Sequence, residues 1–302
     1  MSAWEPGCRR LGVEELRARA EKLKLDSTPC RWCPRRCGAD RLAGEEGSCG
    51  ASAGIAVSSV GLHFGEEAHF VGVGGSGTVF FCGCNLGCLF CQNWEISHAR
   101  EGQVLDAGEL AGQFLWLEAQ RAENLNLVTP SHYPADILAA LALATAQRFA
   151  LPVVWNSSGY DSVETLAHFD GVVDVYMPDF KFASDVLGAQ LTQVSDYATV
   201  ARAALSEMVR QVGPGLALED GVARHGTSVR HLVLPGHTDD SRACLDFLRS
   251  LGEDITVNVM RQYRPAFHAH RLPGMNRLVS REEYAEVVDY GRSIGLRNLL
   301  TQ

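Results

Sequence analysis

Short apolar segments alternate with longer amphipathic segments from residue 78 onwards. The apolar segments are rich in Val, Leu and Phe and lack a two-residue alternation of apolar and polar positions, which is typical of parallel strands buried on both faces. The predicted strands cover residues 78–82, 125–129, 152–156, 172–176, 229–234 and 255–259. The predicted helices cover residues 107–122, 135–149, 162–168, 198–212, 240–251 and 280–294. This alternation predicts an α/β fold with a parallel sheet, either open or closed into a barrel.

A different pattern precedes these strand and helix units. Residues 12–24 predict a charged amphipathic helix, whereas residues 28–50 are rich in Cys, Gly, Pro and Arg and poor in apolar side chains. We therefore predict two parts. Residues 1–70 form an N-terminal helix and a cysteine-rich metal-binding extension, and residues 71–302 form the α/β unit.

The composition is that of a globular protein with a full hydrophobic core, since 46% of the 302 residues are hydrophobic and 21% are charged. Lys and Arg number 27 against 36 Asp and Glu, a formal net charge of −9. This balance argues against a nucleic-acid partner, because phosphate binding needs a concentrated positive field. The longest uncharged stretch, residues 69–94, contains six glycines and four cysteines. We therefore predict no membrane span.

The chain contains ten cysteines, and no apolar segment near Met1 marks it for secretion. We expect a cytoplasmic protein, and in a reducing compartment clustered thiols are more often metal ligands than disulfides. Cys84, Cys88 and Cys91 follow the first predicted strand with the spacing C-x3-C-x2-C. Three thiolates on one loop can bind three irons of a four-iron cluster and leave the fourth iron open. Cys82, at the end of the strand, is expected to point elsewhere.

This triplet, with Phe90 directly before its last cysteine, resembles the radical S-adenosylmethionine superfamily, whose fold is a partial (β/α)6 barrel. Residues 174–181 (DVYMPDFK), 234–240 (LPGHTDD) and 257–265 (VNVMRQYRP) are similar to the branch that contains pyruvate formate-lyase activating enzyme and its uncharacterised paralogues. The resemblance implies a partial TIM-like barrel in which Cys84, Cys88 and Cys91 hold a [4Fe-4S] cluster. Its open iron would bind S-adenosyl-L-methionine, and one electron would release a 5′-deoxyadenosyl radical that takes a hydrogen atom from a substrate.

The resemblance also implies positions near the cofactor. Phe90 would pack near the adenine, or else in the core, and Asp179 and Lys181 match an Asp-x-Lys that lies beside the cofactor, although a structural salt bridge would leave the same pattern. The activating enzyme has Gly-Gly-Glu after its second strand, where this chain has Thr129, Ser131 and His132. Polar residues after the second and third strands could therefore bind the cofactor or cap local turns: Thr129, Ser131, His132, Asn156 and Ser158.

A second set of cysteines, Cys30, Cys33, Cys37 and Cys49, has the spacing C-x2-C-x3-C-x11-C. Four thiols within twenty residues are a complete ligand set for tetrahedral zinc or for a closed [4Fe-4S] cluster. Because this segment has little apolar content, metal binding would supply the free energy that orders it. The sequence leaves zinc and an auxiliary cluster as alternatives.

Three functions follow from these residues. The first is a radical enzyme that activates a glycyl radical enzyme, its partner protein, with electrons from flavodoxin or ferredoxin. The second is a radical enzyme that modifies a small molecule or peptide. The third, of another class, is a non-catalytic zinc or iron–sulfur module that binds partners or senses redox state.

Overall fold

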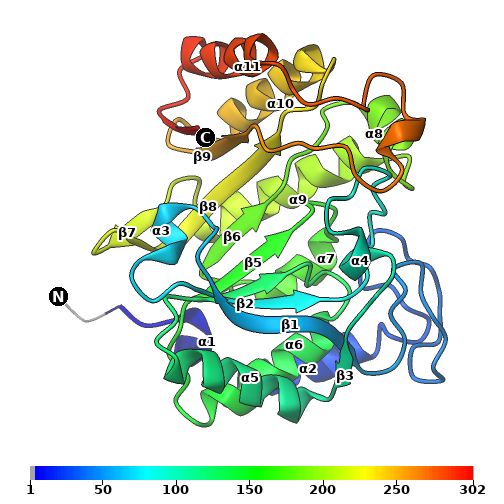
Figure 1. The fold of residues 1–302 in the computed structure, drawn as a ribbon. Helices are drawn as coiled ribbons and strands as arrows, with labels where there is room; N and C mark the ends of the chain where they lie inside the picture. The colour runs from blue at the N-terminus through cyan, green and yellow to red at the C-terminus, as the bar shows by residue number, and fades with distance from the viewer. Residues whose placement is uncertain (1–3, 302) are drawn as a thin grey trace.

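The chain folds around one mixed sheet whose middle strands are parallel (Figure 1). The computed structural model describes residues 4–301. The strands are β1 (Ile55–His63), β2 (Ser76–Phe81), β3 (Gln103–Leu105), β4 (Leu125–Val128), β5 (Val153–Ser157), β6 (Val175–Pro178), β7 (Ala217–Glu219), β8 (Val222–Leu232), β9 (Thr256–Met260) and β10 (Asn298–Thr301).

The strand order is β10-β9-β8-β6-β5-β4-β2-β1-β3, and β7 pairs with β8 outside this path. The strands from β2 to β10 in this order are parallel, whereas β1 and β3 extend the sheet in antiparallel fashion beyond β2. Within residues 4–301, β3 and β10 end the order without pairing to each other. The predicted partial barrel is therefore confirmed, with an open side.

The longer helices cover the outer face of the curved sheet (Figure 1). The helices of the described residues are α1 (Gly7–Leu11), α2 (Val13–Lys24), α3 (Ala68–Val71), α4 (Trp94–Ser97), α5 (Ala107–Ala119), α6 (Pro134–Thr145), α7 (Val163–Leu166), α8 (Asp185–Leu191), α9 (Tyr197–Val212), α10 (Thr238–Leu251) and α11 (Arg281–Ser293), with short 3-10 turns at Ala167–Phe169 and Ala269–Arg271. Capping boxes at Asp106 and Ser280 start α5 and α11. None of the helices in the described residues is long and apolar enough to cross a bilayer.

The predicted elements match the observed ones with one displaced strand. Residues 172–176 were expected to be a strand, but β6 begins only at Val175. Val172 and Val173 instead donate backbone hydrogen bonds to Phe169 and form a buried turn. An apolar pair alone does not distinguish a buried turn from a strand, because both are enclosed in the same core.

The register of the parallel strands brings their carboxyl ends level. Phe80 lies opposite Val128, Val128 opposite Asn156, and Asn156 opposite Met177. The residues that follow β2, β4, β5 and β6 therefore meet at one edge of the sheet, which is where parallel α/β barrels place their functional groups.

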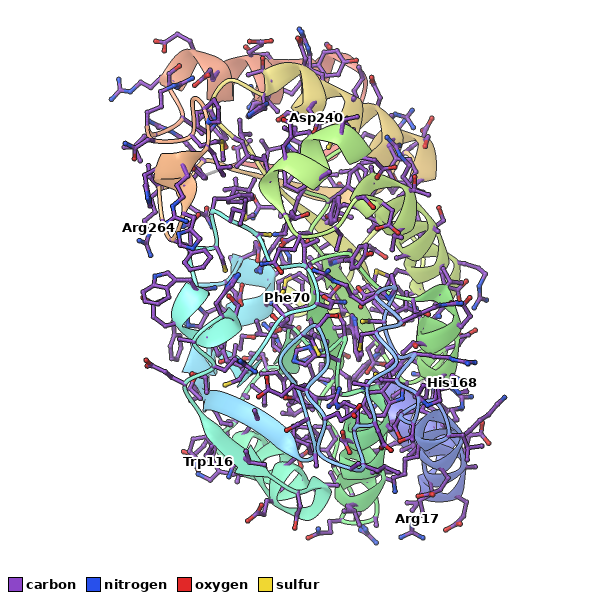
Figure 2. The ribbon with its side chains drawn as sticks, turned by 90° about the vertical axis from the view of Figure 1, so that its right-hand side faces the viewer. Arg17, Phe70, Trp116, His168, Asp240 and Arg264 are labelled. Atoms are coloured by element: carbon purple, nitrogen blue, oxygen red, sulfur yellow. The ribbon has the colours of Figure 1, made fainter. Side chains whose placement is uncertain are left out.

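Helix α3 occupies the inside of the open barrel rather than its outer face. Phe70 is fully buried at the centre of the molecule (Figure 2), where it packs with Val154, Val175, Met177 and Ala223. These side chains come from β5, β6 and the start of β8. The segment between β1 and β2 thus fills the amino-terminal end of the barrel, while its residues Glu66 and Glu67 line a cavity toward the other end.

The N-terminal segment packs directly on this barrel. Helix α2 contacts α6, and the buried core runs without a break from Cys8 and Leu16 to Val79 in β2. Strand β1, which falls in the predicted N-terminal part, pairs with β2 in the main sheet.

Candidate functional site

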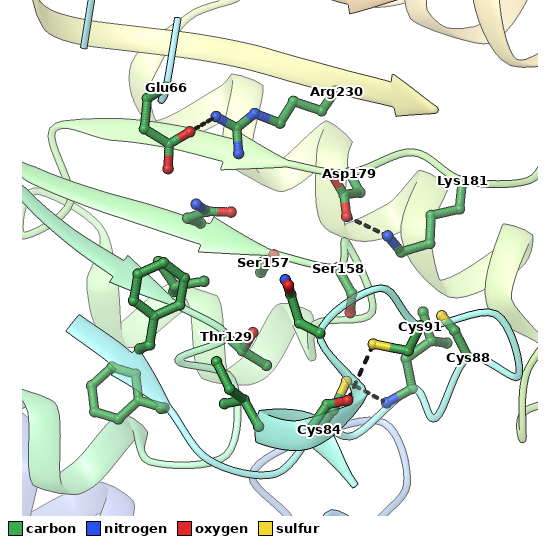
Figure 3. A pocket seen from close by; sticks show the side chains of 18 of the residues that line it. Glu66, Cys84, Cys88, Cys91, Thr129, Ser157, Ser158, Asp179, Lys181 and Arg230 are labelled. Carbon is green, nitrogen blue, oxygen red and sulfur yellow. Dashed lines mark hydrogen bonds and ion pairs between the residues drawn. The ribbon is translucent and has the colours of Figure 1, made fainter. Parts of the chain in front are cut away.

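A cavity of about 430 Å³ opens at the carboxyl ends of the parallel strands (Figure 3). Its volume lies in the range of small-molecule sites. The predicted site residues that line it are Cys84, Cys88, Cys91, Thr129, Asn156, Ser158, Asp179 and Lys181. Thiols from one loop and polar groups from three other loops therefore face one space.

The three thiols belong to the loop after β2, residues 83–91, which we call the cluster loop. Gly83 has a φ of +87°, and a Cβ there would lie 2.5 Å from the carbonyl oxygen of Cys49, so only glycine fits. Backbone hydrogen bonds then fasten the loop to distant segments. Leu89 N–H donates to Leu191 at 2.9 Å, and His268 N–H donates to Leu89 at 2.9 Å. The thiols are thus presented by a loop that several elements hold in place.

Hydrogen-bond donors surround these sulfurs. The backbone N–H of Leu86 lies 3.4 Å from Cys84 Sγ, and Ser97 Oγ lies 3.1 Å from Cys91 Sγ. Ser97 Oγ is also 2.8 Å from His98 Nδ1. If Cys91 is a thiolate, Ser97 donates to it and accepts from His98, since a thiolate carries no proton. Both contacts stabilise negative charge on sulfur.

Burial and nearby charge act in opposite directions on this site. Burial raises the pKa of the Cys84 and Cys88 thiols, and the positive charge of Lys181 opposes it. Burial also works against the charge of Lys181, but Asp179 and the Cys88 thiol outweigh it and raise the pKa of the ammonium. Because burial favours the neutral thiols, Cys84 and Cys88 would become thiolates when they coordinate a metal, which removes the thiol proton.

A four-iron cluster fits this donor set. In residues 4–301 no group of three or more Cys, His, Asp or Glu side chains is arranged as the ligands of a single metal ion. A cluster does not need such convergence, because each thiolate binds a different iron. The hydroxyl of Ser158, buried at the cavity wall, has no hydrogen-bond partner among the described residues. It is an orphaned polar group of the kind that a bound cofactor satisfies.

Thr129 adds backbone strain to the cavity wall. Its φ is +61°, a left-handed conformation that a β-branched residue rarely adopts, and its N–H donates to Asn156 at 2.8 Å. Such outliers cost about 1–3 kcal/mol and cluster at functional sites. The strained backbone at Thr129 therefore lies directly at the cavity wall, after β4.

Three residues expected near the cofactor do not line the cavity. Phe90 is 4% exposed and packs against Phe182 and Tyr263 in the core, which was the alternative expectation for it. Ser131 and His132 are buried below the rim, and His132 Nε2 lies 2.8 Å from the carbonyl oxygen of Cys82. His132 thus contacts the backbone that leads into the cluster loop.

Sequence reasoning missed the charged wall opposite the thiols. Just before α3, Glu66 forms an ion pair with Arg230 of β8 (Figure 3). Glu67 also pairs with Arg230, and Asn258 Nδ2 donates to Glu67 at 2.6 Å. Burial raises the pKa of Glu67, but the hydrogen bonds from Arg230 and Asn258 outweigh it and lower the pKa to about 2. The available signal was Arg230 itself, a charged residue inside an apolar strand.

The second cysteine set gathers in the N-terminal cysteine segment, residues 30–49. Cys30, Cys33 and Cys49 are buried and Cys37 is exposed. Each sulfur accepts a hydrogen bond from the backbone N–H two residues further along the chain, on Trp32, Arg35, Ala39 and Ala51. Burial raises the pKa of the Cys30, Cys33 and Cys49 thiols, and these hydrogen bonds only oppose it. At Cys37 the hydrogen bonds outweigh burial and lower the pKa.

Comparisons with known proteins bear on family and fold. No protein-family model matches the sequence. An uncharacterised protein of Methanocaldococcus jannaschii is 32% identical over 277 residues, which cover 88% of this chain and 75% of that protein. The solved structure of SuiB from Streptococcus suis superposes with a TM-score of 0.48 and 13% identity over 72% of this chain. The match spans only 47% of the SuiB chain.

Proposed function

We propose that this chain, which belongs to the same family as the uncharacterised protein of Methanocaldococcus jannaschii, is a radical S-adenosylmethionine enzyme. The observation that carries the proposal is the joint position of Cys84, Cys88 and Cys91 in one cavity at the carboxyl ends of a partial barrel. Three thiols leave one iron of a four-iron cluster without a protein ligand. An open metal position of this kind separates catalytic centres from closed structural ones.

The chain's own groups prepare this cavity for the reaction. When bound, a [4Fe-4S] cluster and S-adenosyl-L-methionine supply one-electron cleavage and a 5′-deoxyadenosyl radical. Cys84, Cys88 and Cys91 would hold three irons, while Lys181 places positive charge beside their sulfurs. Asp179 pairs with Lys181 and keeps its ammonium in place.

Polar groups on the neighbouring strand ends would bind the polar parts of S-adenosyl-L-methionine. Ser158 offers a buried hydroxyl with no partner among residues 4–301, and Asn156 and Thr129 line the same wall. The sheet and the segment around α3 enclose the cavity on its inner side. This enclosure shields a radical from solvent and from side reactions.

The finer proposal concerns the substrate, for which the sequence resemblance is the support. As an activating enzyme, the protein would abstract hydrogen from a glycine Cα in a partner protein, whose loop would have to enter the cavity. Flavodoxin or ferredoxin would supply the electron. A glycyl radical enzyme gene beside this gene supports the activating role. A genome without any such enzyme contradicts it and leaves modification of a small molecule or peptide.

The class of reaction is tested by S-adenosylmethionine cleavage. Protein reconstituted anaerobically with iron and sulfide and reduced with dithionite is expected to form 5′-deoxyadenosine, detected by chromatography. Cys84→Ala should abolish this product. Cys82→Ala is the matched control, because Cys82 Sγ contacts the Glu101 carbonyl oxygen at 3.4 Å instead of facing the cavity. Cleavage that survives in Cys84→Ala would refute the assigned site, and no cleavage by the wild type would favour a non-catalytic module.

A further inference from the structure

We propose that the N-terminal cysteine segment is a thiolate metal site that positions the cluster loop, so that metal binding at Cys30, Cys33, Cys37 and Cys49 and cluster binding at Cys84, Cys88 and Cys91 stabilise each other. The second half of this inference rests on the proposed function. The ordering of the cluster loop by a metal at the N-terminal cysteines does not depend on which reaction the protein catalyses.

The chain packs closely around the sulfur atoms of the four N-terminal cysteines. The thiols of Cys30 and Cys37 contact each other, and a Cβ at Gly47 would lie 3.1 Å from Cys37 Sγ and 3.5 Å from Cys49 Sγ. A glycine is therefore needed where the chain passes the sulfurs. A backbone N–H is directed at each sulfur, and four gathered thiols are a complete ligand set for a closed [4Fe-4S] cluster, in which each sulfur binds a different iron.

The segment touches the cluster loop at its first ligand. The backbone N–H of Cys84 donates to the carbonyl oxygen of Cys49 at 3.1 Å. Each of these two residues is a predicted ligand of its own site. Gly83, directly before Cys84, packs so closely on the same carbonyl that no larger residue fits. A shift of Cys49 would therefore move the start of the cluster loop.

Arg35 makes a second connection. Its backbone N–H faces the sulfur of Cys33, and its guanidinium donates to the carbonyl oxygens of Asn85 at 2.7 Å and Leu86 at 3.3 Å. Leu86 in turn directs its N–H at Cys84 Sγ. One residue thus joins an N-terminal thiol to the peptide that supports a cluster ligand. Hydrogen bonds from a charged group are stronger than neutral ones, so this connection is well suited to transmit order.

These contacts make the coupling reciprocal. If a metal at the N-terminal cysteines stabilises the bound conformation of residues 84–91, a cluster at those residues must strengthen metal binding by the same factor. The expected benefit is a cluster loop that is ordered before the cluster is inserted.

Cys37→Ser tests the metal site. Cys37 is the exposed thiol of the four, so its replacement disturbs the core least. In anaerobically purified full-length protein we expect elemental analysis to show loss of the N-terminal metal. We also expect hydrogen–deuterium exchange of the amides in residues 84–91 to become about tenfold faster. In the wild type, about eight irons without zinc identifies a second cluster. One zinc with about four irons would mean that the four thiols converge on a single ion, an arrangement that residues 4–301 do not have in this structure.

Arg35→Ala tests the connection separately from metal binding, because all four thiols remain. We expect this variant to keep its N-terminal metal, to exchange residues 84–91 about tenfold faster and to lose cluster iron faster to a chelator. Arg31→Ala is the matched control, since the Arg31 side chain is exposed and has no hydrogen bond or ion pair with residues 4–301. It should behave as the wild type, and circular dichroism should show all variants folded.

Two results would overturn the inference: full metal content in Cys37→Ser, or metal loss that leaves exchange of residues 84–91 unchanged. Cys84→Ala distinguishes this failure from failure of the proposed function. If Cys84→Ala and the wild type have the same iron content, Cys84 holds no iron and the radical-enzyme proposal fails. If the N-terminal metal still orders residues 84–91 in that case, the positioning role stands.

Discussion

Ser97 is the side chain best placed to set the reduction potential of a cluster held by Cys91. Its hydroxyl lies 3.1 Å from Cys91 Sγ and is itself held by His98 Nδ1 at 2.8 Å. Hydrogen bonds to cluster sulfurs stabilise the reduced cluster, which carries one more negative charge, and so raise the reduction potential. Ser97→Ala should therefore make the potential more negative, by about 60 mV if one hydrogen bond of about 1.4 kcal/mol is lost. Redox titration followed by electron paramagnetic resonance measures this shift.

Ser97→Thr is the conservative control for this prediction, because it keeps the hydroxyl. Its potential should stay close to that of the wild type. An unchanged potential in Ser97→Ala would mean that the hydroxyl does not donate to the cluster ligand.

His132 contributes to stability in a pH-dependent way. Burial lowers its pKa from 6.5 to about 4, while its ring contacts the Cys82 carbonyl oxygen. Between these values the unfolded chain binds a proton that the folded protein does not, so the free energy of unfolding decreases as pH falls. His132→Gln keeps a donor but does not titrate. Between pH 7.5 and pH 5 the wild type should lose about 2 kcal/mol more stability than this variant, measured by urea unfolding. If the free energy of unfolding of the wild type and of His132→Gln changed with pH in the same way, the prediction would be wrong.

At the residue scale, spacing identified the cysteines but not every neighbour of the cavity. Cys84, Cys88 and Cys91 lie on one short loop, so their proximity follows from sequence distance alone. The burial of His132 under Cys82 depends on the pairing of β2 with β4, which places two separate loops together. Phe90 follows the motif, yet its ring packs with Phe182 and Tyr263, and no local pattern specifies that contact.

At the element scale, the segment around α3 is held inside the barrel by charge as well as by Phe70. Arg230 pairs with Glu66 and Glu67, and all three side chains are nearly buried. Arg230→Ala would leave two buried carboxylates without their partner, which costs about 3–5 kcal/mol. We expect a loss of that size in the free energy of unfolding, measured by chemical denaturation.

Arg292→Ala is the control for this prediction, because Arg292 pairs with Asp289 on the exposed face of α11. Its cost should stay within about 1 kcal/mol, as for most surface ion pairs. Equal effects of the two variants would show that the Glu66, Glu67 and Arg230 network does not hold this segment.

The parallel strands and long helices could be predicted from the sequence because burial on two faces or one face leaves a regular pattern. Strands β1, β3, β7 and β10 escaped prediction, since few of their residues are buried and they lack a continuous apolar run. Helix α3 is only four residues long, too short for a helical period. Its place inside the barrel is a tertiary contact that the sequence does not encode locally.

At the scale of the whole molecule, two cysteine sets far apart in the sequence meet across Cys49 and Cys84. The sheet register brings the ends of β2, β4, β5 and β6 to the same cavity, and the segment around α3 closes its inner end. Composition and spacing indicated two metal sites, but their contact could be seen only once the chain was folded. The proposed function requires that Cys84, Cys88 and Cys91 leave one iron of the cluster free for S-adenosyl-L-methionine.

The electron paramagnetic resonance spectrum of the reduced protein, recorded with and without S-adenosyl-L-methionine, shows whether this iron is free. A ligand on the open iron must change the spectrum of that cluster, whereas a second, closed cluster would not respond. We predict that the wild type and Cys82→Ala show the change and that Cys88→Ala lacks the responsive signal. If the wild-type spectrum of the reduced cluster is identical with and without S-adenosyl-L-methionine, the three cysteines do not leave an iron open to this cofactor.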